Sequence, residues 1–196
     1  MNPAAPTPTT VVRSATREDL SAIAPLAARL VREHHGYDAQ RFLLIEPVEE
    51  GYRWFLNREI DNPDVVLLVA TEGATGDVIG YAYGGLVERD WQALREACGA
   101  LHDVYVDERA RRRGVAEALV REMIARLKSR GAPRVVLSSA WPNKRAQSLF
   151  ARIGFRPTMV EMTIETDAGG GKTPIRAAGS EAGGAPSGDA GGSPSG

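Results

Sequence analysis

A basic stretch in the middle of the chain could bind a phosphate group. Three consecutive arginines stand directly before Gly114, between an apolar segment that ends at Val106 and a helical pattern that begins at Gly114. The first N–H groups of a helix have no partner within the helix and carry the positive end of its dipole, so they bind anions. Glycine lets a phosphate approach the backbone without a Cβ in the way. A pyrophosphate site is therefore predicted, and a surface loop of solvated arginines is the alternative.

Other phosphate-binding and metal-binding motifs do not explain this segment. It contains neither GxxxxGK[ST] nor GxGxxG, so P-loop and dinucleotide-binding folds fit poorly. Cys98 is the one cysteine, which excludes an intrachain disulfide, and no cluster of cysteine and histidine suggests zinc. We therefore expect no metal at the site.

Apolar periodicity predicts the elements that position this segment. Thr16 followed by Asp19 resembles a capping box at a helix start, while Gly131 and Gly154 mark helix ends. The stretch from residue 65 to 88 resembles two strands joined by a turn. The predicted strands are residues 11–15, 65–71, 78–88, 101–106, 134–140 and 155–165, and the predicted helices are residues 16–34, 48–60, 114–130 and 143–153.

This order predicts a single α/β (α+β) domain built on a mixed sheet. The hairpin at 65–88 implies antiparallel pairing, whereas strands that alternate with helices in the second half imply parallel pairing. Helices are expected on both faces of the sheet. We predict a folded domain over residues 11–166, a disordered N-terminus over 1–10 and a disordered Gly/Ala/Ser/Pro tail over 167–196.

Composition excludes several classes of protein. The chain has 196 residues, of which 43% are hydrophobic, and its 24 basic residues nearly balance its 25 acidic ones. Bulk charge thus favours neither a nucleic acid nor a membrane surface as a partner. The N-terminal sequence has no signal-peptide pattern, and no apolar run approaches the length of a membrane span. A cytoplasmic location is expected.

Two motifs together resemble a known family. The run Arg111-Arg112-Arg113-Gly114-Val115-Ala116 is similar to the R/Q-x-x-G-x-G/A motif of the GNAT N-acetyltransferases, with Ala116 in place of the second glycine. The second motif, N-x-x-A-x-x-L-[YF]-x-x-x-G-F, is matched by Asn143, Ala146, Leu149, Phe150, Gly154 and Phe155. The resemblance extends from about residue 12 to 165. The segments LHDVYV and AW also resemble the spermidine/spermine and diamine acetyltransferase branch of the family.

The resemblance implies a sheet that is splayed between its fourth and fifth strands, at 101–106 and 134–140. Acetyl-CoA would lie in the gap, with its pantetheine arm paired to the backbone of Val104 and Val106 like an added strand. Its pyrophosphate would lie on the amides at 112–117. The implied acetyl-CoA contacts are Val104, Tyr105, Val106, Arg111, Arg112, Arg113, Gly114, Val115, Ala116, Glu117, Asn143, Ala146 and Phe150.

The implied reaction needs a base, because an alkyl amine with a pKa of about 10 must lose a proton before it attacks. His102 is the first candidate, since imidazoles suit proton removal near neutral pH. Asp103 is the second, and strand alternation predicts that it points away from His102. Water could instead link Glu88 or Asp90 to the amine. The backbone N–H of Val104 is the candidate donor to the oxyanion.

One position departs from the family pattern. Many relatives carry a tyrosine seven residues after the motif asparagine as general acid, and this chain has Phe150 there. Losing a general acid costs about 10²–10⁴ in rate. We therefore expect a slower enzyme, or one that uses water.

The acceptor is predicted to be a small-molecule primary amine that attacks directly in a ternary complex. An acidic and aromatic rim of Glu88, Asp90 and Trp91 would suit a cation. His34 and Tyr37, at the end of the first helix, are further candidates for the acceptor site. A protein lysine or N-terminus as acceptor, and an acyl-CoA sensor with little turnover, are the alternatives. A homodimer is a further expectation.

Overall fold

The computed structural model describes residues 9–166. Residues 9–160 belong to one compact unit, and residues 161–166, described by themselves, contain neither helix nor strand. Apart from Thr9 and Thr10, the ends predicted to be disordered lie outside the described residues. Thr10 is not irregular, since it begins the first strand. In residues 9–166, none of the helices has the length and apolar character that crossing a membrane requires.

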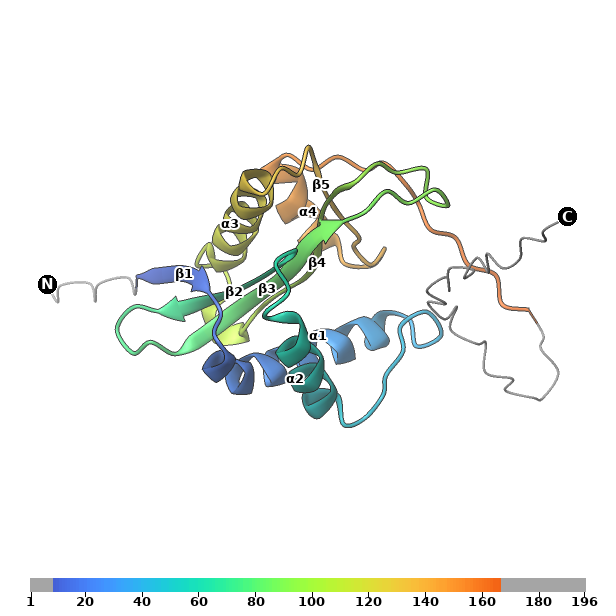
Figure 1. Ribbon diagram of the computed structural model, residues 1–196. Helices are drawn as coiled ribbons and strands as arrows, with labels where there is room; N and C mark the ends of the chain where they lie inside the picture. The colour runs from blue at the N-terminus through green and yellow to red at the C-terminus, as the bar shows by residue number, and fades with distance from the viewer. Residues whose placement is uncertain (1–8, 167–196) are drawn as a thin grey trace, which may run out of the picture. The chain divides into compact units, whose positions relative to one another are not determined.

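Five strands form one sheet in the order β1-β2-β3-β4-β5 (Figure 1). The pairs β1–β2, β2–β3 and β3–β4 are antiparallel, and β4–β5 is parallel, which confirms the predicted mixed sheet. The strands are β1 (Thr10–Ser14), β2 (Val65–Glu72), β3 (Val78–Val87), β4 (Cys98–Val106) and β5 (Val135–Leu137), and the helices are α1 (Leu20–Tyr37), α2 (Val48–Glu59), α3 (Val115–Ser129) and α4 (Lys144–Ile153).

Helices cover both faces of the sheet, as predicted. Alternate residues of β2 point to opposite faces, so that Leu68 packs with α3 while Leu67 and Val69 pack with α1 and α2. Burial on both faces explains why β2 is an almost continuous apolar run. Figure 1 shows α3 and α4 on one side of the sheet, with α1 and α2 on the other. The sheet therefore separates two hydrophobic clusters.

The fourth and fifth strands separate soon after they pair. They are paired only from Gly99–Val135 to Leu101–Leu137, and β4 then continues to Val106 while β5 ends. The predicted splay between these strands is confirmed. One edge of β4 beyond Leu101 consequently has no strand beside it.

The predicted sixth strand is wrong. Residues 155–166 form no strand, and the sheet ends at β5. Pro157 has no N–H to donate to a ladder, and β5 offers an edge of only 3 residues. The fourth strand also starts at Cys98, before the predicted start at residue 101, and the fifth is shorter than predicted.

A β-bulge interrupts β4 where it begins to leave β5. Tyr83 of β3 lies opposite Asp103 but the next residue, Gly84, lies opposite Leu101, so His102 is one extra residue in β4. Gly84 fits closely here, since a Cβ on it would lie 2.4 Å from the carbonyl oxygen of Ala100 and 3.1 Å from the sulfur of Met123. The bulge thus depends on a residue without a side chain.

We expect Gly84→Ala to lower the free energy of unfolding by about 1–3 kcal/mol, because the added methyl group overlaps a backbone oxygen. Gly51→Ala is the matched control, since Gly51 lies in α2 with open space around its Cβ position. That variant should gain about 0.5–1 kcal/mol from the helix propensity of alanine. Urea denaturation of both variants tests this, and equal midpoints would contradict it.

Asp19 joins the first strand to the first helix. Its carboxylate accepts hydrogen bonds from the Arg13 guanidinium at 2.7 and 2.8 Å and from the backbone N–H of Thr16 at 2.8 Å. The hydrogen bond from Arg13 is the main reason that the pKa of Asp19 lies below its ordinary value, and the bond from Thr16 adds to it. The ionised carboxylate therefore stabilises the fold.

We expect Asp19→Asn to destabilise the protein by about 1–2 kcal/mol at neutral pH. The contribution is present above the pKa of about 3.9 that aspartate has in unfolded chains, and is lost as the pH falls through the lowered pKa of folded Asp19. The difference between wild type and variant should therefore shrink in acid. Denaturation at several pH values measures it, with the exposed Asp64→Asn as a control. A difference that does not change with pH would refute the role of the charge.

Candidate functional site

The turn between β4 and α3 presents backbone N–H groups. Gly114 precedes the helix with φ 79° and ψ 0°, and Arg112 two residues earlier also has a positive φ of 62°. Two left-handed residues so close together curve the backbone into a concave turn of the kind that binds anions. The N–H of Ala118 bonds to the carbonyl of Gly114 at 3.0 Å, and no side chain caps this helix start. The N–H groups of residues 115–117 can therefore donate hydrogen bonds to an anion.

The three arginines of this turn differ in their contacts, which the sequence alone did not indicate. Arg111 donates to the hydroxyl of Tyr105 at 3.1 Å and to the carbonyl of Val106 at 3.3 Å. Arg113 forms an ion pair with Glu72 of β2 at 2.8 Å. The side chain of Arg112 is exposed. Arg111 and Arg113 thus hold the turn against the sheet, and Arg112 is the most accessible charge beside the N–H groups.

The free edge of β4 carries the backbone groups of alternate residues. The N–H of Asp107 bonds to Ile79 of β3 at 2.9 Å, so the backbone groups of Asp107 and Tyr105 point toward β3. Those of Val104 and Val106 point the other way, to the side where β5 has ended. The Val106 carbonyl accepts a hydrogen bond from Arg111, and the other backbone groups of this edge can pair with an extended chain, which is the arrangement that the family resemblance implies for Val104 and Val106.

Residues on the far side of the gap are part of the fold. The side-chain oxygen of Asn143 accepts the N–H of Ala146 at 3.0 Å and so caps α4. Phe150 is buried in the α3-side cluster, edge-on to Phe155 with ring centroids 5.9 Å apart. Ser139, just after β5, has a buried hydroxyl without a hydrogen-bond partner. Asn143 keeps its amide N–H groups for another partner.

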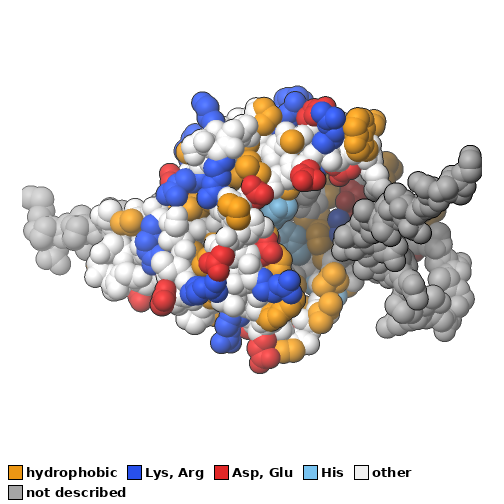
Figure 2. Space-filling view, viewed as in Figure 1, with side chains coloured by type: hydrophobic (Ala, Val, Ile, Leu, Met, Phe, Trp, Pro, Cys, Tyr) orange, Lys and Arg blue, Asp and Glu red, His pale blue; other side chains and the backbone are white. Residues whose placement is uncertain are grey.

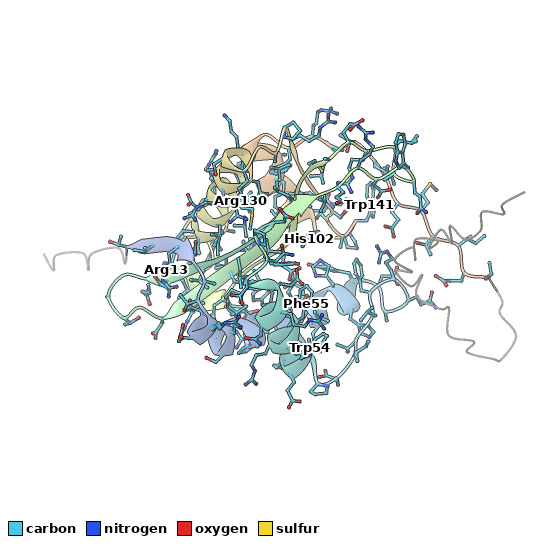
Figure 3. All side chains as sticks on the ribbon, viewed as in Figure 1. Arg13, Trp54, Phe55, His102, Arg130 and Trp141 are labelled. Atoms are coloured by element: carbon cyan, nitrogen blue, oxygen red, sulfur yellow. The ribbon has the colours of Figure 1, made fainter. Side chains whose placement is uncertain are left out.

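The predicted opposition of His102 and Asp103 is wrong, because the bulge breaks the alternation of β4. The His102 ring lies 5.3 Å from the ring of Tyr83, and the Asp103 carboxylate accepts a hydrogen bond from Tyr81 at 3.1 Å. Both tyrosines point to the α1/α2 face. His102 and Asp103 therefore lie on the same face. Figure 2 shows a hollow with histidine near the centre of the molecule, and Figure 3 places His102 there, near Phe55 of α2.

Asp103 is held by tyrosines that the sequence analysis did not select. Tyr81, whose hydroxyl bonds to the carboxylate, is fully buried. Burial raises the pKa of Asp103, and the hydroxyls of Tyr81 and Tyr52 of α2 act in the opposite direction. Burial also raises the pKa of Tyr83 to about 12, with help from Glu59, whose carboxylate accepts its hydroxyl at 3.4 Å. The alternating tyrosines in the sequence GYAYGG are the signal that could have identified Tyr81 and Tyr83 from the sequence.

The predicted acceptor-site residues are divided between two parts of the fold. Glu88 and Trp91 line a shallow hollow on the loop between β3 and β4, where Trp91 is exposed. The carboxylate of Asp90 accepts the N–H groups of Gln92 and Ala93 at 3.0 and 2.9 Å and thereby forms the turn of this loop. The Asp90 carboxylate therefore stabilises the turn of its own loop.

The other two acceptor candidates lie near the end of α1. A ring nitrogen of His34 lies 2.9 Å from the carbonyl of Leu30, and the hydroxyl of Tyr37 donates to Glu33 at 2.8 Å. Both side chains therefore have a polar partner within the helix. Within residues 9–166, no group of three or more His, Cys, Asp or Glu side chains has the geometry of a metal site.

Comparison with known proteins identifies the family. Residues 30–155 match the model of the acetyltransferase (GNAT) family. The chain therefore belongs to the GNAT acetyltransferases, as the two motifs indicated.

Individual relatives are distant. The chain is 32% identical to a D-amino-acid N-acetyltransferase of Saccharomyces cerevisiae over 47% of its length and 56% of the relative's. It is also 32% identical to a glucosamine 6-phosphate N-acetyltransferase of Oryza sativa, over 52% and 59% of the two chains. It thus spans little more than half of these relatives. A predicted acetyltransferase of Clostridium acetobutylicum, solved with acetyl-CoA, has the same fold with a TM-score of 0.63, 15% identity and coverage of 80% and 96%.

Proposed function

We propose that the protein transfers an acetyl group from acetyl-CoA to a primary amine of a small molecule. The observation that carries this proposal is the free edge of β4 beside an uncapped start of α3. An extended arm that ends in a diphosphate fits these two features together. Membership of the GNAT family supports the same conclusion, as does the acetyl-CoA bound to a protein of the same fold.

Different residues of the gap bind different parts of acetyl-CoA. The N–H groups of residues 115–117 receive the diphosphate, and Arg112 adds an exposed charge. The backbone of Val104 and Val106 pairs with the pantetheine arm. The amide of Asn143 flanks the arm from α4. Tyr105 and Phe150 are buried, so we assign them to the packing on either side of the gap rather than to contact with the arm.

Acetyl transfer then proceeds on the α1/α2 face of the bulge. His102 is exposed there and accepts the proton of the incoming ammonium. The amine nitrogen attacks the thioester carbonyl, whose oxygen takes the negative charge and is bonded by the N–H of Val104. The C–S bond breaks, and the thiolate leaves with the electron pair. The acetylated nitrogen loses its extra proton to water, and because Phe150 has no proton to give, that proton passes through water to the thiolate.

A small molecule is the favoured acceptor. The two relatives named above act on a D-amino acid and on glucosamine 6-phosphate, and both acceptors are small amines. The spermidine/spermine branch, a cytoplasmic location and a homodimer stay predictions from the sequence.

We expect Gly114→Ala to weaken acetyl-CoA binding about tenfold, equivalent to about 1.4 kcal/mol. Its Cβ would disfavour the positive φ and stand beside the diphosphate. Gly76→Ala is the matched control, because Gly76 has a φ of 77°, no atom within 4 Å of its Cβ position, and a place in the β2–β3 turn. Titration calorimetry should find unchanged binding in the control. Equal weakening in both variants would mean that strain alone is responsible.

We expect His102→Ala to lower kcat by about 10²–10⁴ with little change in the affinity for acetyl-CoA, because the variant loses the base but keeps the cofactor contacts. Release of the CoA thiol with a panel of amines measures this. His35→Gln, which removes an imidazole from α1, should behave as wild type. Equal rates for wild type and His102→Ala would refute the assignment of the base. Stabilisation by acetyl-CoA without thiol release from any amine would instead indicate an acyl-CoA sensor.

A further inference from the structure

Asp103 is a half-buried carboxylate without a basic partner. It accepts a hydrogen bond from Tyr81 of β3 at 3.1 Å, and the hydroxyl of Tyr52 of α2 also favours its ionised form. Within residues 9–166, neither arginine nor lysine forms an ion pair with it, and the basic groups that act on its pKa are the imidazoles of His102 and His34. The tyrosine hydroxyls are neutral, so they hold the carboxyl group in place and add no opposite charge when it ionises.

Aromatic rings line the same face beside this carboxylate. Tyr52 and Phe55 of α2 lie 6.4 Å apart, Phe55 and Tyr83 lie 5.4 Å apart, and Tyr83 and His102 lie 5.3 Å apart between ring centroids. The rings of Tyr52, Phe55 and Tyr83 are half-buried, and His102 is exposed. We call these four residues the aromatic wall. Half-exposed ring faces attract cations.

We propose that Asp103 is a specificity-determining residue, which favours acceptor amines that carry no carboxylate next to the reacting nitrogen. This inference rests on the proposed function, since it places the acceptor against the aromatic wall when its nitrogen reaches His102. An ammonium group is attracted by the Asp103 charge and by the rings. The carboxylate of an α-amino acid would enter the same space and be repelled. Amino alcohols and amino sugars are therefore accepted in preference to amino acids.

The preference should depend on pH through Asp103 itself. The titratable groups that face it are His102 of β4, Tyr81 and Tyr83 of β3, Tyr52 of α2 and His34 of α1, and Glu59 of α2 bonds to Tyr83. Burial raises the pKa of Asp103, so the preference should increase as the pH rises and the carboxylate ionises. Tyr81→Phe removes a hydrogen bond to the ionised form and should move this increase to higher pH.

A matched pair of acceptors tests the proposal. Alaninol and alanine share a carbon skeleton and differ by the carboxylate, and thiol release gives kcat/KM for each. We expect wild type to prefer alaninol at least about tenfold, and Asp103→Asn to reduce that preference about tenfold. Asp103→Glu should retain part of the preference, and Asp64→Asn, at an exposed site away from the wall, should retain all of it.

Each outcome separates this proposal from the one on which it rests. Thiol release with the same ratio in wild type and Asp103→Asn, or a wild-type preference for alanine, would overturn the role of Asp103 and leave acetyl transfer intact. Absence of thiol release with every amine would overturn both. Should Asp103→Asn fail to fold, the pH profile of Tyr81→Phe decides, since an unshifted profile contradicts the proposal.

Discussion

The separation of β4 from β5 is the constraint on which the rest of the site depends. A strand inside a sheet has both edges occupied, and β4 has both occupied only as far as Leu101. Beyond that point β3 alone holds it, while the backbone groups of Val104 and Val106 point to a side without a strand. Backbone polar groups in a folded protein need partners, so this edge is suited to an extended ligand. Ser138, Ser139 and Pro142, which follow β5, do not favour its continuation.

The bulge at His102 adds a second constraint at the same point of β4. A regular strand would have placed His102 and Asp103 on opposite faces. The extra residue turns both toward α1 and α2, and it restores Val104 and Val106 to the α3 side, where they pack with Leu101. An imidazole and a carboxyl group are thus combined on one face by a change in register rather than by a loop. Gly84 makes this possible because Ala100 and Met123 leave no room for a side chain there.

The sequence predicted most of the fold because its signals are local. The apolar run of β2, the capping pair Thr16 and Asp19, and the glycines that end two helices depend on neighbouring residues. The bulge was not predictable, since register depends on how β3 and β4 fit under α3. The contacts of Arg111 and Arg113 were missed for a similar reason, because Tyr105 and Glu72 approach them only in three dimensions. The prediction of a sixth strand was wrong because a strand with a suitable pattern still needs the edge of a neighbouring strand to pair with, and β5 offers only 3 residues.

The two hydrophobic clusters on opposite faces of the sheet have a consequence for how such a protein can diverge. Ala110 and Val115, on either side of the turn, belong to the α3 cluster, whereas Tyr52, Phe55 and Tyr83 of the aromatic wall belong to the α1/α2 cluster. Arg111 of the turn contacts Glu33 of α1 and Tyr105, but within residues 9–166 none of its hydrogen bonds or ion pairs is with α2. Changes at sites that share no contacts combine almost additively, so mutations in α2 can alter the proposed acceptor pocket with little effect on the turn. A preference for a new acceptor can thus arise by mutation on one side of the sheet, before any change on the other side.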